Sequence, residues 1–321
     1  MAEKTRFELK LGPATREAFG RTLVELGREN KDVVVVDADL SKSTMTYGFS
    51  QAFPERFFTC GIAEANMVAL AAGLASAGKI PFASSFSAFL LTKGFEQLRV
   101  TVAYPSVNVK LVGTHSGISI GEDGPSQMSV EDLALACALP GFTVIAPADD
   151  AATCALVRAA AALAGPVFVR TGRVKVPIVY TAGQQFEIGK AIELLDGSDV
   201  TLMAHGLMVA ESIRAAETLE AEGISARVVD MHTIKPLDRA AIRRAAAETG
   251  AIVVSEEHLA DAGLGVRVAQ ATAELHPCVM EFVGVQNTYA ESGTPEGLLD
   301  KYGLVAREVV AAARRALARK K

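Results

Sequence analysis

Short runs of β-branched and apolar residues alternate along this chain with longer segments in which apolar positions recur at helical spacing. In the first half, the pattern predicts strands over residues 33–36, 57–61, 80–85, 107–113, 143–146 and 167–170, and helices over residues 15–27, 64–77, 87–103, 130–139 and 149–163. In the second half, it predicts strands over residues 200–204, 226–231, 252–255 and 279–283, and helices over residues 207–222, 239–249, 266–275, 295–302 and 307–320. Such alternation is typical of parallel sheets covered by helices on both faces. We therefore expect the α/β fold class, with doubly wound, mostly parallel sheets.

Residues 173–186 interrupt this alternation, because they include proline and glycine and show no helical period. A single hydrophobic core rarely serves more than about 250–300 residues, and this chain has 321. We expect two domains, at residues 1–180 and 187–321, joined by this segment.

Three polar residues, Asp39, His115 and Arg170, come at or just after expected strands of the first domain. Ligands of such sheets bind at the carboxyl ends of the strands. Arg170 ends an apolar run, so its guanidinium needs an anion, either a protein carboxylate or a phosphate. Ser43 also follows a strand and could donate to a bound phosphate. His115 precedes the glycine-rich residues 117–124, so a structural hydrogen bond and a role beside a mobile loop both remain open.

Other residues admit both a structural and a chemical interpretation. Glu64 stands among apolar residues at the start of a helix, where it either interacts with the helix dipole or shares a proton with a ligand nitrogen. Phe86 and Phe89 either belong to the core or stack on a flat heterocycle. Asp123, inside the glycine-rich segment, either caps the next turn or contacts a substrate.

The composition argues against several classes of protein. A formal net charge of −5 gives no broad basic surface for nucleic acid, and no segment has the ~20 apolar residues of a membrane span. The four cysteines lack metal-ligand spacing and the N-terminus is polar, so we expect a reduced, cytoplasmic protein. The glycine fingerprints of nucleotide-binding sites are absent. Glu256, Glu257, His258 and Asp261 match no zinc-ligand spacing, so we expect no metal site on this chain.

Six segments of the sequence occur in the same order as in one enzyme family. They are Thr15-Arg16, Asp37-Ala38-Asp39-Leu40, Ile62-Ala63-Glu64-Ala65-Asn66-Met67, Ser85-Phe86-Ser87-Ala88-Phe89, the segment from His115 to Gln127, and Ile234-Lys235-Pro236-Leu237-Asp238. From about residue 14 to its end, the chain resembles the C-terminal half of transketolases, which consists of a pyrimidine-binding domain for thiamine diphosphate and a C-terminal domain. The resemblance implies transfer of a two-carbon ketol unit from a phosphorylated ketose to an aldose.

The resemblance also implies roles for individual residues. Glu64 is similar to the family's glutamate that hydrogen-bonds the aminopyrimidine ring of the cofactor and assists removal of the thiazolium proton. His115 is implied as a second catalytic residue. The remaining residues are implied to bind the cofactor (Asp39, Leu40, Phe86, Phe89 and Gln127), to hold the phosphate of the sugar (Arg16, Ser43, His115 and Arg170) or to contact a substrate hydroxyl (Asp123).

Three positions depart from the family pattern. Gln127 stands where many members have His, and Thr92 stands where some have Tyr. The segment Arg173-Val174-Lys175 is an unusual continuation after the phosphate arginine. These departures leave the identity of the substrate more open than that of the cofactor.

Complete transketolases also carry an N-terminal half with a Gly-Asp-Gly…Asn motif for magnesium and diphosphate, and this sequence contains no such motif. The resemblance therefore implies the smaller subunit of a split enzyme. Thiamine diphosphate would lie at the interface, with Mg²⁺ or Ca²⁺ on an N-terminal partner subunit, and the chain would self-associate across a two-fold axis in a heterotetramer. Neither nucleic acid nor a membrane is expected as a partner.

Three alternatives remain open from the sequence. The first is a neighbouring thiamine enzyme, either half of a deoxyxylulose-phosphate synthase or the beta subunit of a 2-oxo-acid dehydrogenase. The second is a non-catalytic paralogue that only docks to a partner. The third is a free-standing nucleotide-binding α/β protein.

Overall fold

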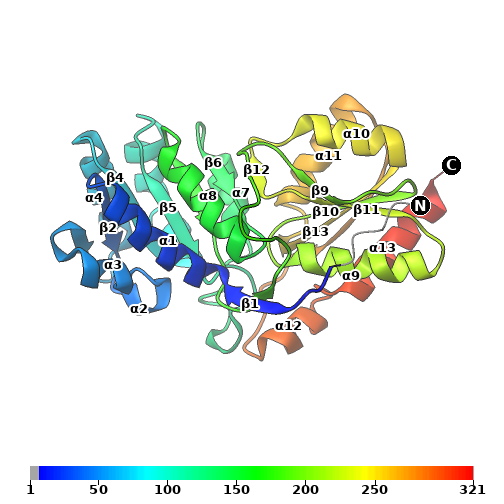
Figure 1. Cartoon of the computed structure of the whole chain (residues 1–321), viewed down its shortest axis with the longest axis horizontal. Helices are drawn as coiled ribbons and strands as arrows, with labels where there is room; N and C mark the ends of the chain where they lie inside the picture. Colours follow the sequence, from blue (N-terminus) through cyan, green and yellow to red (C-terminus); the bar gives the residue numbers. More distant parts are fainter. Residues whose placement is uncertain (1–6, 321) are drawn as a thin grey trace.

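Two sheets with helices on both faces lie side by side in the computed structural model, which describes residues 7–320 (Figure 1). The first sheet has seven strands in the order β12-β6-β7-β5-β4-β2-β3, and the second has five in the order β14-β13-β10-β11-β9. In both sheets the central pairs are parallel and one edge strand is antiparallel. The expected α/β fold class with two mostly parallel sheets is confirmed.

The first sheet is built mainly from the first half of the chain. Its strands are β2 (Val33–Asp37), β3 (Phe57–Thr59), β4 (Ile80–Phe86), β5 (Lys110–Thr114), β6 (Thr143–Ile145) and β7 (Val167–Arg170). Its main helices are α1 (Thr15–Glu29), α2 (Ser41–Thr44), α3 (Tyr47–Ala52), α4 (Glu64–Ser76), α7 (Asp132–Ala138) and α8 (Asp150–Ala162). Strand β2 is buried along its whole length, as a central parallel strand requires when helices cover both faces.

The single helix predicted over residues 87–103 is divided in the structure. It consists of α5 (Ser87–Lys93), α6 (Phe95–Gln97) and a π-helical turn over Leu98–Ala103. Gly94 separates the first two pieces, and a Cβ there would lie 2.6 Å from the carbonyl oxygen of Leu90. The tight approach allows α5 to end beside α4, and this break brings the end of α5 close to Glu64, which begins α4.

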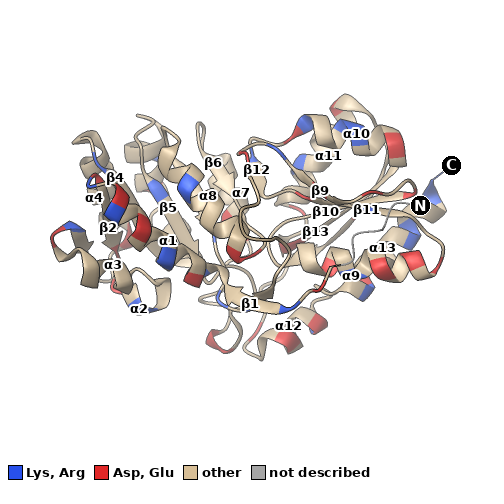
Figure 2. Cartoon of the chain, in the orientation of Figure 1, with Lys and Arg blue, Asp and Glu red and all other residues tan. Residues whose placement is uncertain are grey.

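The second sheet follows the predicted pattern with small shifts of boundary, except that the pattern does not predict its edge strand β9. Its strands are β9 (Ile192–Leu195), β10 (Val200–Ala204), β11 (Ala226–Asp230), β13 (Ala251–Leu259) and β14 (Val279–Val285). Its helices are α9 (Met208–Ala221), α10 (Arg239–Thr249), α11 (Leu264–Leu275), α12 (Pro295–Lys301) and α13 (Ala306–Arg319). Figure 2 shows both signs of charge distributed over the outer helices of the two units. Among residues 7–320, no helix is both long and apolar enough to cross a membrane.

The structure contains short strands that the sequence pattern missed. Strand β12 (Thr233–Lys235) belongs to the second half but pairs antiparallel with β6, at the edge of the first sheet. Strand β1 (Leu11–Ala14) pairs with β8 (Lys175–Pro177), which lies within the predicted linker. Strands this short are too brief to show a hydrophobic period. Of these strands, β12 links the second half of the chain to the first sheet.

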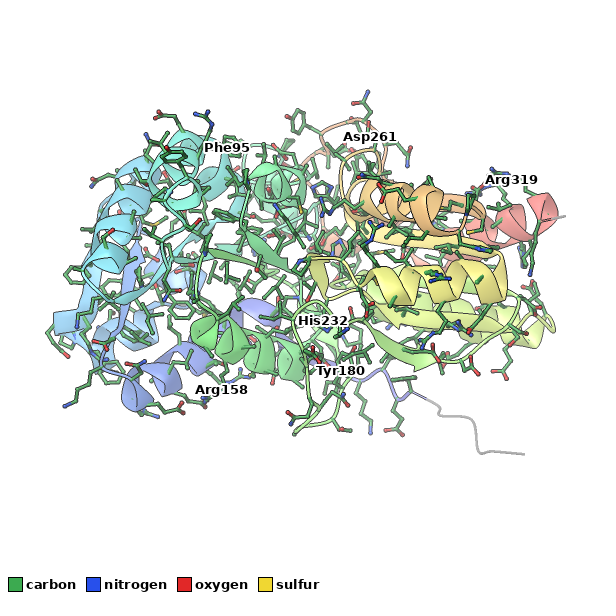
Figure 3. The ribbon with its side chains drawn as sticks, turned by 90° about the horizontal axis from the view of Figure 1, so that it is seen from above. Phe95, Arg158, Tyr180, His232, Asp261 and Arg319 are labelled. Carbon is green, nitrogen blue, oxygen red and sulfur yellow. The ribbon has the colours of Figure 1, made fainter. Side chains whose placement is uncertain are left out.

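A buried polar contact lies beneath this junction, where Tyr180 and His232 are seen between the two units (Figure 3). The hydroxyl of Tyr180 donates to Oδ2 of Asp230 at 2.7 Å. The ring of Phe186 meets both Tyr180 and His232 edge-on. Burial raises the pKa of Asp230 to about 7. At neutral pH this carboxyl is therefore only partly ionised.

The raised pKa of Asp230 predicts a pH dependence of stability. Between about pH 4 and pH 7 the folded chain holds a proton on Asp230 that the unfolded chain has lost, so this stabilisation is complete below that range and is lost as the pH rises through 7. Between pH 6 and pH 8.5, the wild type should lose about 1.4 kcal/mol of unfolding free energy through this group. Asp230→Asn keeps an oxygen for Tyr180 and should remove that loss. Urea unfolding of both proteins at the two pH values measures it, and an equal loss in both would contradict the assignment.

Candidate functional site

Neighbouring strands β5, β4 and β2 bring their carboxyl ends to one edge of the first sheet. Strand β2 ends at Asp37, β4 ends at Phe86, and His115 follows β5 directly. Because the strands are parallel, these ends meet, and a ligand of the sheet binds there. The candidate site is built at this edge, and helices α4 and α5 contribute to it.

Glu64 is buried at the first position of α4, with 2 % of its surface exposed. Its Oε1 accepts a hydrogen bond from Ser85 Oγ at 3.1 Å. Its Oε2 is also buried but has no hydrogen-bond partner. A buried polar atom without a partner costs about 1–3 kcal/mol, so this oxygen is suited to a ligand that supplies a partner.

Aromatic rings line the site next to Glu64. The ring of Phe86 stacks on His115 with 3.8 Å between centroids, and on Phe89 with 5.6 Å between centroids. Phe86 is thus covered on both sides, whereas Phe89 is only partly buried. Of the two phenylalanines, Phe89 offers more surface to a flat ligand.

Lys93 connects the carboxylate and the aromatic ring. Its Nζ lies 3.4 Å from Glu64 Oε2, without a hydrogen bond, and 4.2 Å from the centroid of the Phe89 ring. A cation held between an acid and a ring face is stabilised by both. The lysine therefore interacts with the same two groups that a heterocyclic ligand would use.

Arg16, at the start of α1, lies against His115. Arg16 Nη1 donates to the carbonyl oxygen of Ser43 at 2.8 Å and lies 2.9 Å from His115 Nε2. Since a guanidinium only donates, His115 Nε2 accepts, and Nδ1–H donates to Thr114 Oγ1 at 2.8 Å. Arg16 Nε is buried without a partner. This guanidinium retains donor capacity for a bound anion.

His115 is held neutral in an unusual backbone conformation. Burial, and then the charges of Arg16 and Arg173, lower the pKa of His115 to about 3. Its φ is +58°, in the left-handed region that is strained for a residue with a side chain. Strain of this kind gathers at functional sites. In this state His115 acts as an acceptor that orients Arg16, and it carries no positive charge toward an anion.

The structure gives Arg170 a protein partner. Its Nε donates to Asp132 Oδ2 at 2.9 Å, and its Nη2 donates to the carbonyl oxygens of Ser129 and Glu257. The whole side chain is buried. Of the two anions that the sequence left open, the structure shows the carboxylate as the partner of Nε. A contact between Arg170 and a sugar phosphate stays a prediction, which the Arg170→Ala variant below tests. Asp132 also accepts from Ser87 Oγ at 2.7 Å, so the ion pair supports α5.

Arg173 is the basic residue that sequence reasoning overlooked. It is partly exposed, and its Nη1 donates to the carbonyl oxygen of Ile120 and to Glu122 Oε2. Its charge lowers the pKa of both His115 and Arg16, so it lies near them. The signal in the sequence is its position three residues after Arg170, in the segment that departs from the family pattern.

The remaining candidate residues lie around this cluster. Burial lowers the pKa of Arg16, and the charge of Asp123 partly offsets that lowering, so the exposed carboxylate of Asp123 lies near Arg16. Asp37 accepts hydrogen bonds from the Leu40 amide and from the hydroxyls of Thr44 and Thr46. The resulting turn leaves Asp39 exposed with a φ of +66°. Gln127 lies at the end of the glycine-rich segment and accepts from Ser126 Oγ.

The acidic group of the second half supports the fold. Glu256 accepts from the amides of Leu264 and Gly265 at the start of α11, at 2.7 and 2.8 Å. His258 is fully buried between Asp132 and Glu256. Within residues 7–320, no three acidic, histidine or cysteine side chains are grouped in a way that could hold a metal ion.

Comparison with known families and proteins gives consistent matches. Residues 12–178 match the family described as transketolase, pyrimidine binding domain, and residues 189–309 match the transketolase C-terminal domain. The chain is 45 % identical to a putative transketolase C-terminal section of Methanocaldococcus jannaschii, over 90 % of this chain and 92 % of that protein. It is 40 % identical to the 6-deoxy-6-sulfo-D-fructose transketolase subunit SqwH of a Clostridium species, over 98 % of each chain.

A solved structure is similar over almost the whole chain. It is described as a split gene transketolase, inactive beta4 tetramer. It superposes with a TM-score of 0.91 at 51 % identity and covers 97 % of this chain and 100 % of its own.

Proposed function

Because this chain belongs to the transketolase family, we propose that it is the C-terminal subunit of a split transketolase and transfers a two-carbon ketol unit between sugars with thiamine diphosphate. Bound thiamine diphosphate would supply the nucleophilic carbon for that transfer. The observation that carries the proposal is the buried Oε2 of Glu64, which has no hydrogen-bond partner. A carboxyl group there, when protonated, can donate to a ring nitrogen of the cofactor.

The residues around Glu64 fit the pyrimidine end of this cofactor. Ser85 Oγ donates to Oε1 and fixes the carboxyl plane, so the other oxygen keeps one orientation. Phe89 can stack on the ring and, together with Phe86, exclude water from it. Asp39 and Leu40, presented by the turn at Asp37, and Gln127 complete the proposed cofactor contacts. Glu64 holds and moves the proton, and the other residues orient the ring.

We assign the anionic end of the sugar to the basic cluster of Arg16 and Arg173, with Ser43, His115 and Asp123 beside it. Arg16 Nε lacks a partner, and a guanidinium matches the geometry of phosphate or sulfonate oxygens. The name of the Clostridium relative specifies a sulfonated fructose, which also carries an anion at the end of the sugar. Binding of this remote group orients the reacting carbonyl. His115 is proposed to accept and relay hydrogen bonds as a neutral imidazole.

The proposed enzyme requires an N-terminal partner subunit. Support comes from relatives of the same length, since the chain covers 98 % of the Clostridium subunit and 100 % of the split-gene chain. That split-gene structure is described as an inactive tetramer of beta chains. We propose that the partner binds the diphosphate and a Mg²⁺ or Ca²⁺ ion, that two copies of each subunit associate, and that the domains extend over residues 1–180 and 187–321.

A product assay tests the proposal against its neighbours. The chain is mixed with the N-terminal transketolase subunit of the same organism, thiamine diphosphate and Mg²⁺, and is offered either xylulose 5-phosphate with ribose 5-phosphate or pyruvate. Ketol transfer from the ketose, with no consumption of pyruvate, is the expected result. Release of carbon dioxide from pyruvate would instead indicate a deoxyxylulose-phosphate synthase or 2-oxo-acid dehydrogenase activity.

Lys93 is predicted to weaken cofactor binding. Its Nζ interacts with Glu64 Oε2 and Phe89, and it must leave before a ring can stack there. Lys93→Met removes the charge and should strengthen binding of thiamine diphosphate to the two-subunit complex by about three- to tenfold, the effect of losing one exposed cation–π contact and one ion pair. Calorimetric titration measures the affinity. Lys79→Met, which removes a surface lysine paired with Asp32, serves as the control, and weaker binding by Lys93→Met would show that the lysine contacts the cofactor.

A further inference from the structure

The C-terminal unit contacts the glycine loop, defined here as residues 117–124, through a buried carboxylate. Oε1 of Glu257, on β13, accepts a hydrogen bond from the backbone amide of Ser119 at 2.7 Å. A Cβ on Gly117 would lie 2.1 Å from the Glu257 carboxyl carbon. Glycine at 117 is therefore required for the carboxylate to reach the loop.

A second part of the C-terminal unit also supports the loop. A Cβ on Gly121 would lie 3.0 Å from the ring of Pro295, which begins α12. A Cβ on Gly124 would lie 2.5 Å from Ser292 Oγ. The loop thus touches the second unit at both of its ends.

The opposite side of the loop is held by the basic cluster of the first unit. Arg173 donates to the carbonyl oxygen of Ile120, one residue after Ser119, and to Glu122. Movement of the loop at Ser119 would therefore move Ile120 and the Arg173 guanidinium with it. It would also move Asp123, whose charge acts on Arg16.

The free-energy cost of burying the Glu257 carboxyl group indicates that this residue has a role beyond packing. Its side chain is 4 % exposed, and burial raises its pKa above the ordinary value despite the nearby Arg170. Replacing a buried ion pair with apolar residues of similar volume is often neutral or stabilising. Stability alone therefore gives little reason for a carboxylate at this position.

We propose that Glu257 is a positioning residue of the C-terminal unit, which holds the glycine loop so that Arg173 faces the anionic end of the sugar and Asp123 faces a sugar hydroxyl. This inference rests on the proposed function. It assigns to the C-terminal unit a part in substrate binding, although none of its side chains need touch the substrate.

The experiment compares variants on both sides of the contact. Glu257→Ala removes the acceptor, and Gly117→Ala places a methyl group against it. Glu257→Gln keeps an oxygen that accepts from the Ser119 amide, so its exchange rate and KM should stay close to those of the wild type. Two matched control variants test for nonspecific loss of stability. Glu256→Ala removes the neighbouring buried carboxylate, which binds α11 instead, and Gly183→Ala introduces a side chain at a similar φ with no neighbour within 4 Å.

Two readouts are taken. Hydrogen–deuterium exchange on the full chain follows the Ser119 amide, and steady-state kinetics with the N-terminal subunit give KM and kcat for the phosphorylated ketose. We expect Glu257→Ala and Gly117→Ala to speed exchange at Ser119 and to raise KM about tenfold with little change in kcat. The double variant Glu257→Ala/Gly117→Ala should show the same exchange rate and the same KM as Glu257→Ala alone, because its added methyl group no longer meets a carboxylate. Glu256→Ala should lower stability without changing KM.

The outcomes separate the two proposals. Unchanged exchange at Ser119 in Glu257→Ala would overturn the positioning role, whatever the enzyme does. Faster exchange with an unchanged KM in an active enzyme would also overturn it. A wild-type complex without ketol transfer would instead count against the proposed function, while the exchange result would still report on the contact.

Discussion

Glu64→Gln is expected to lower turnover of the two-subunit enzyme by about 10²–10⁴-fold, the range typical of a lost general acid–base group. Glutamine keeps the size of the side chain and an oxygen for Ser85, so the fold and the subunit contacts should persist. It cannot take up or release a proton as a carboxyl group does. Steady-state assays of the assembled variant, with gel filtration to follow assembly, measure both effects.

The control for this prediction is Glu55→Gln, since Glu55 is exposed and pairs only with its neighbour Arg56 among the described residues. It should leave turnover unchanged. Full turnover in Glu64→Gln would remove Glu64 from the chemistry, and loss of subunit assembly would show that its role is structural. A non-catalytic docking paralogue would show no turnover even in the wild type.

Arg173→Ala and Arg170→Ala are expected to have different effects, although the two residues are three positions apart. Arg173→Ala should lower kcat/KM for a phosphorylated ketose by about ten- to a hundredfold, since a hydrogen bond to a charged group contributes about 1.5–3 kcal/mol. Its stability should change little, because the side chain is partly exposed. Steady-state kinetics of each variant measure kcat/KM, and urea unfolding measures the free energy of unfolding.

Arg170→Ala should instead destabilise the fold by about 3–5 kcal/mol, because it leaves the buried Asp132 without its partner. The fraction that remains folded should bind the sugar phosphate with nearly normal KM. If Arg170→Ala raised KM in a fully stable protein, or Arg173→Ala left KM unchanged, the assignment of the anion site would be reversed.

Much of this site could be predicted from the order of residues at strand ends. Glu64 was recognisable because a carboxylate among apolar residues at the start of a helix is costly to bury unless it is paired, and the structure leaves one of its oxygens without a hydrogen-bond partner. His115 was recognisable as a polar residue between a strand and a glycine-rich segment. These residues are placed by local features, namely strand ends, helix starts and turns.

Arg170 and Arg173 could not be distinguished by the same reasoning. Both are basic residues at the end of one strand, and which of them is buried depends on Asp132 and on the second unit. Asp132 lies 38 residues away in the sequence, and Glu257 lies 87 away. No local pattern records those contacts.

The pairing of β12 with β6, which joins the two units, could not be predicted either, because it also depends on residues far apart in the sequence. Strand β12 gains its hydrogen bonds from β6, far away in sequence, and its three residues show no period of their own. The charge of His115 also depends on the fold. An exposed imidazole is partly protonated near neutral pH, but burial beside two arginines keeps this one neutral.

The central claim is that one end of a thiamine diphosphate site lies on this chain and the other on a partner. Calorimetric titration with thiamine diphosphate and Mg²⁺ tests it, using this chain alone, the N-terminal transketolase subunit alone, and an equimolar mixture of the two. The account predicts strong binding by the mixture and weak or undetectable binding by this chain alone. Binding by this chain alone that is as strong and as magnesium-dependent as that of the mixture would contradict it.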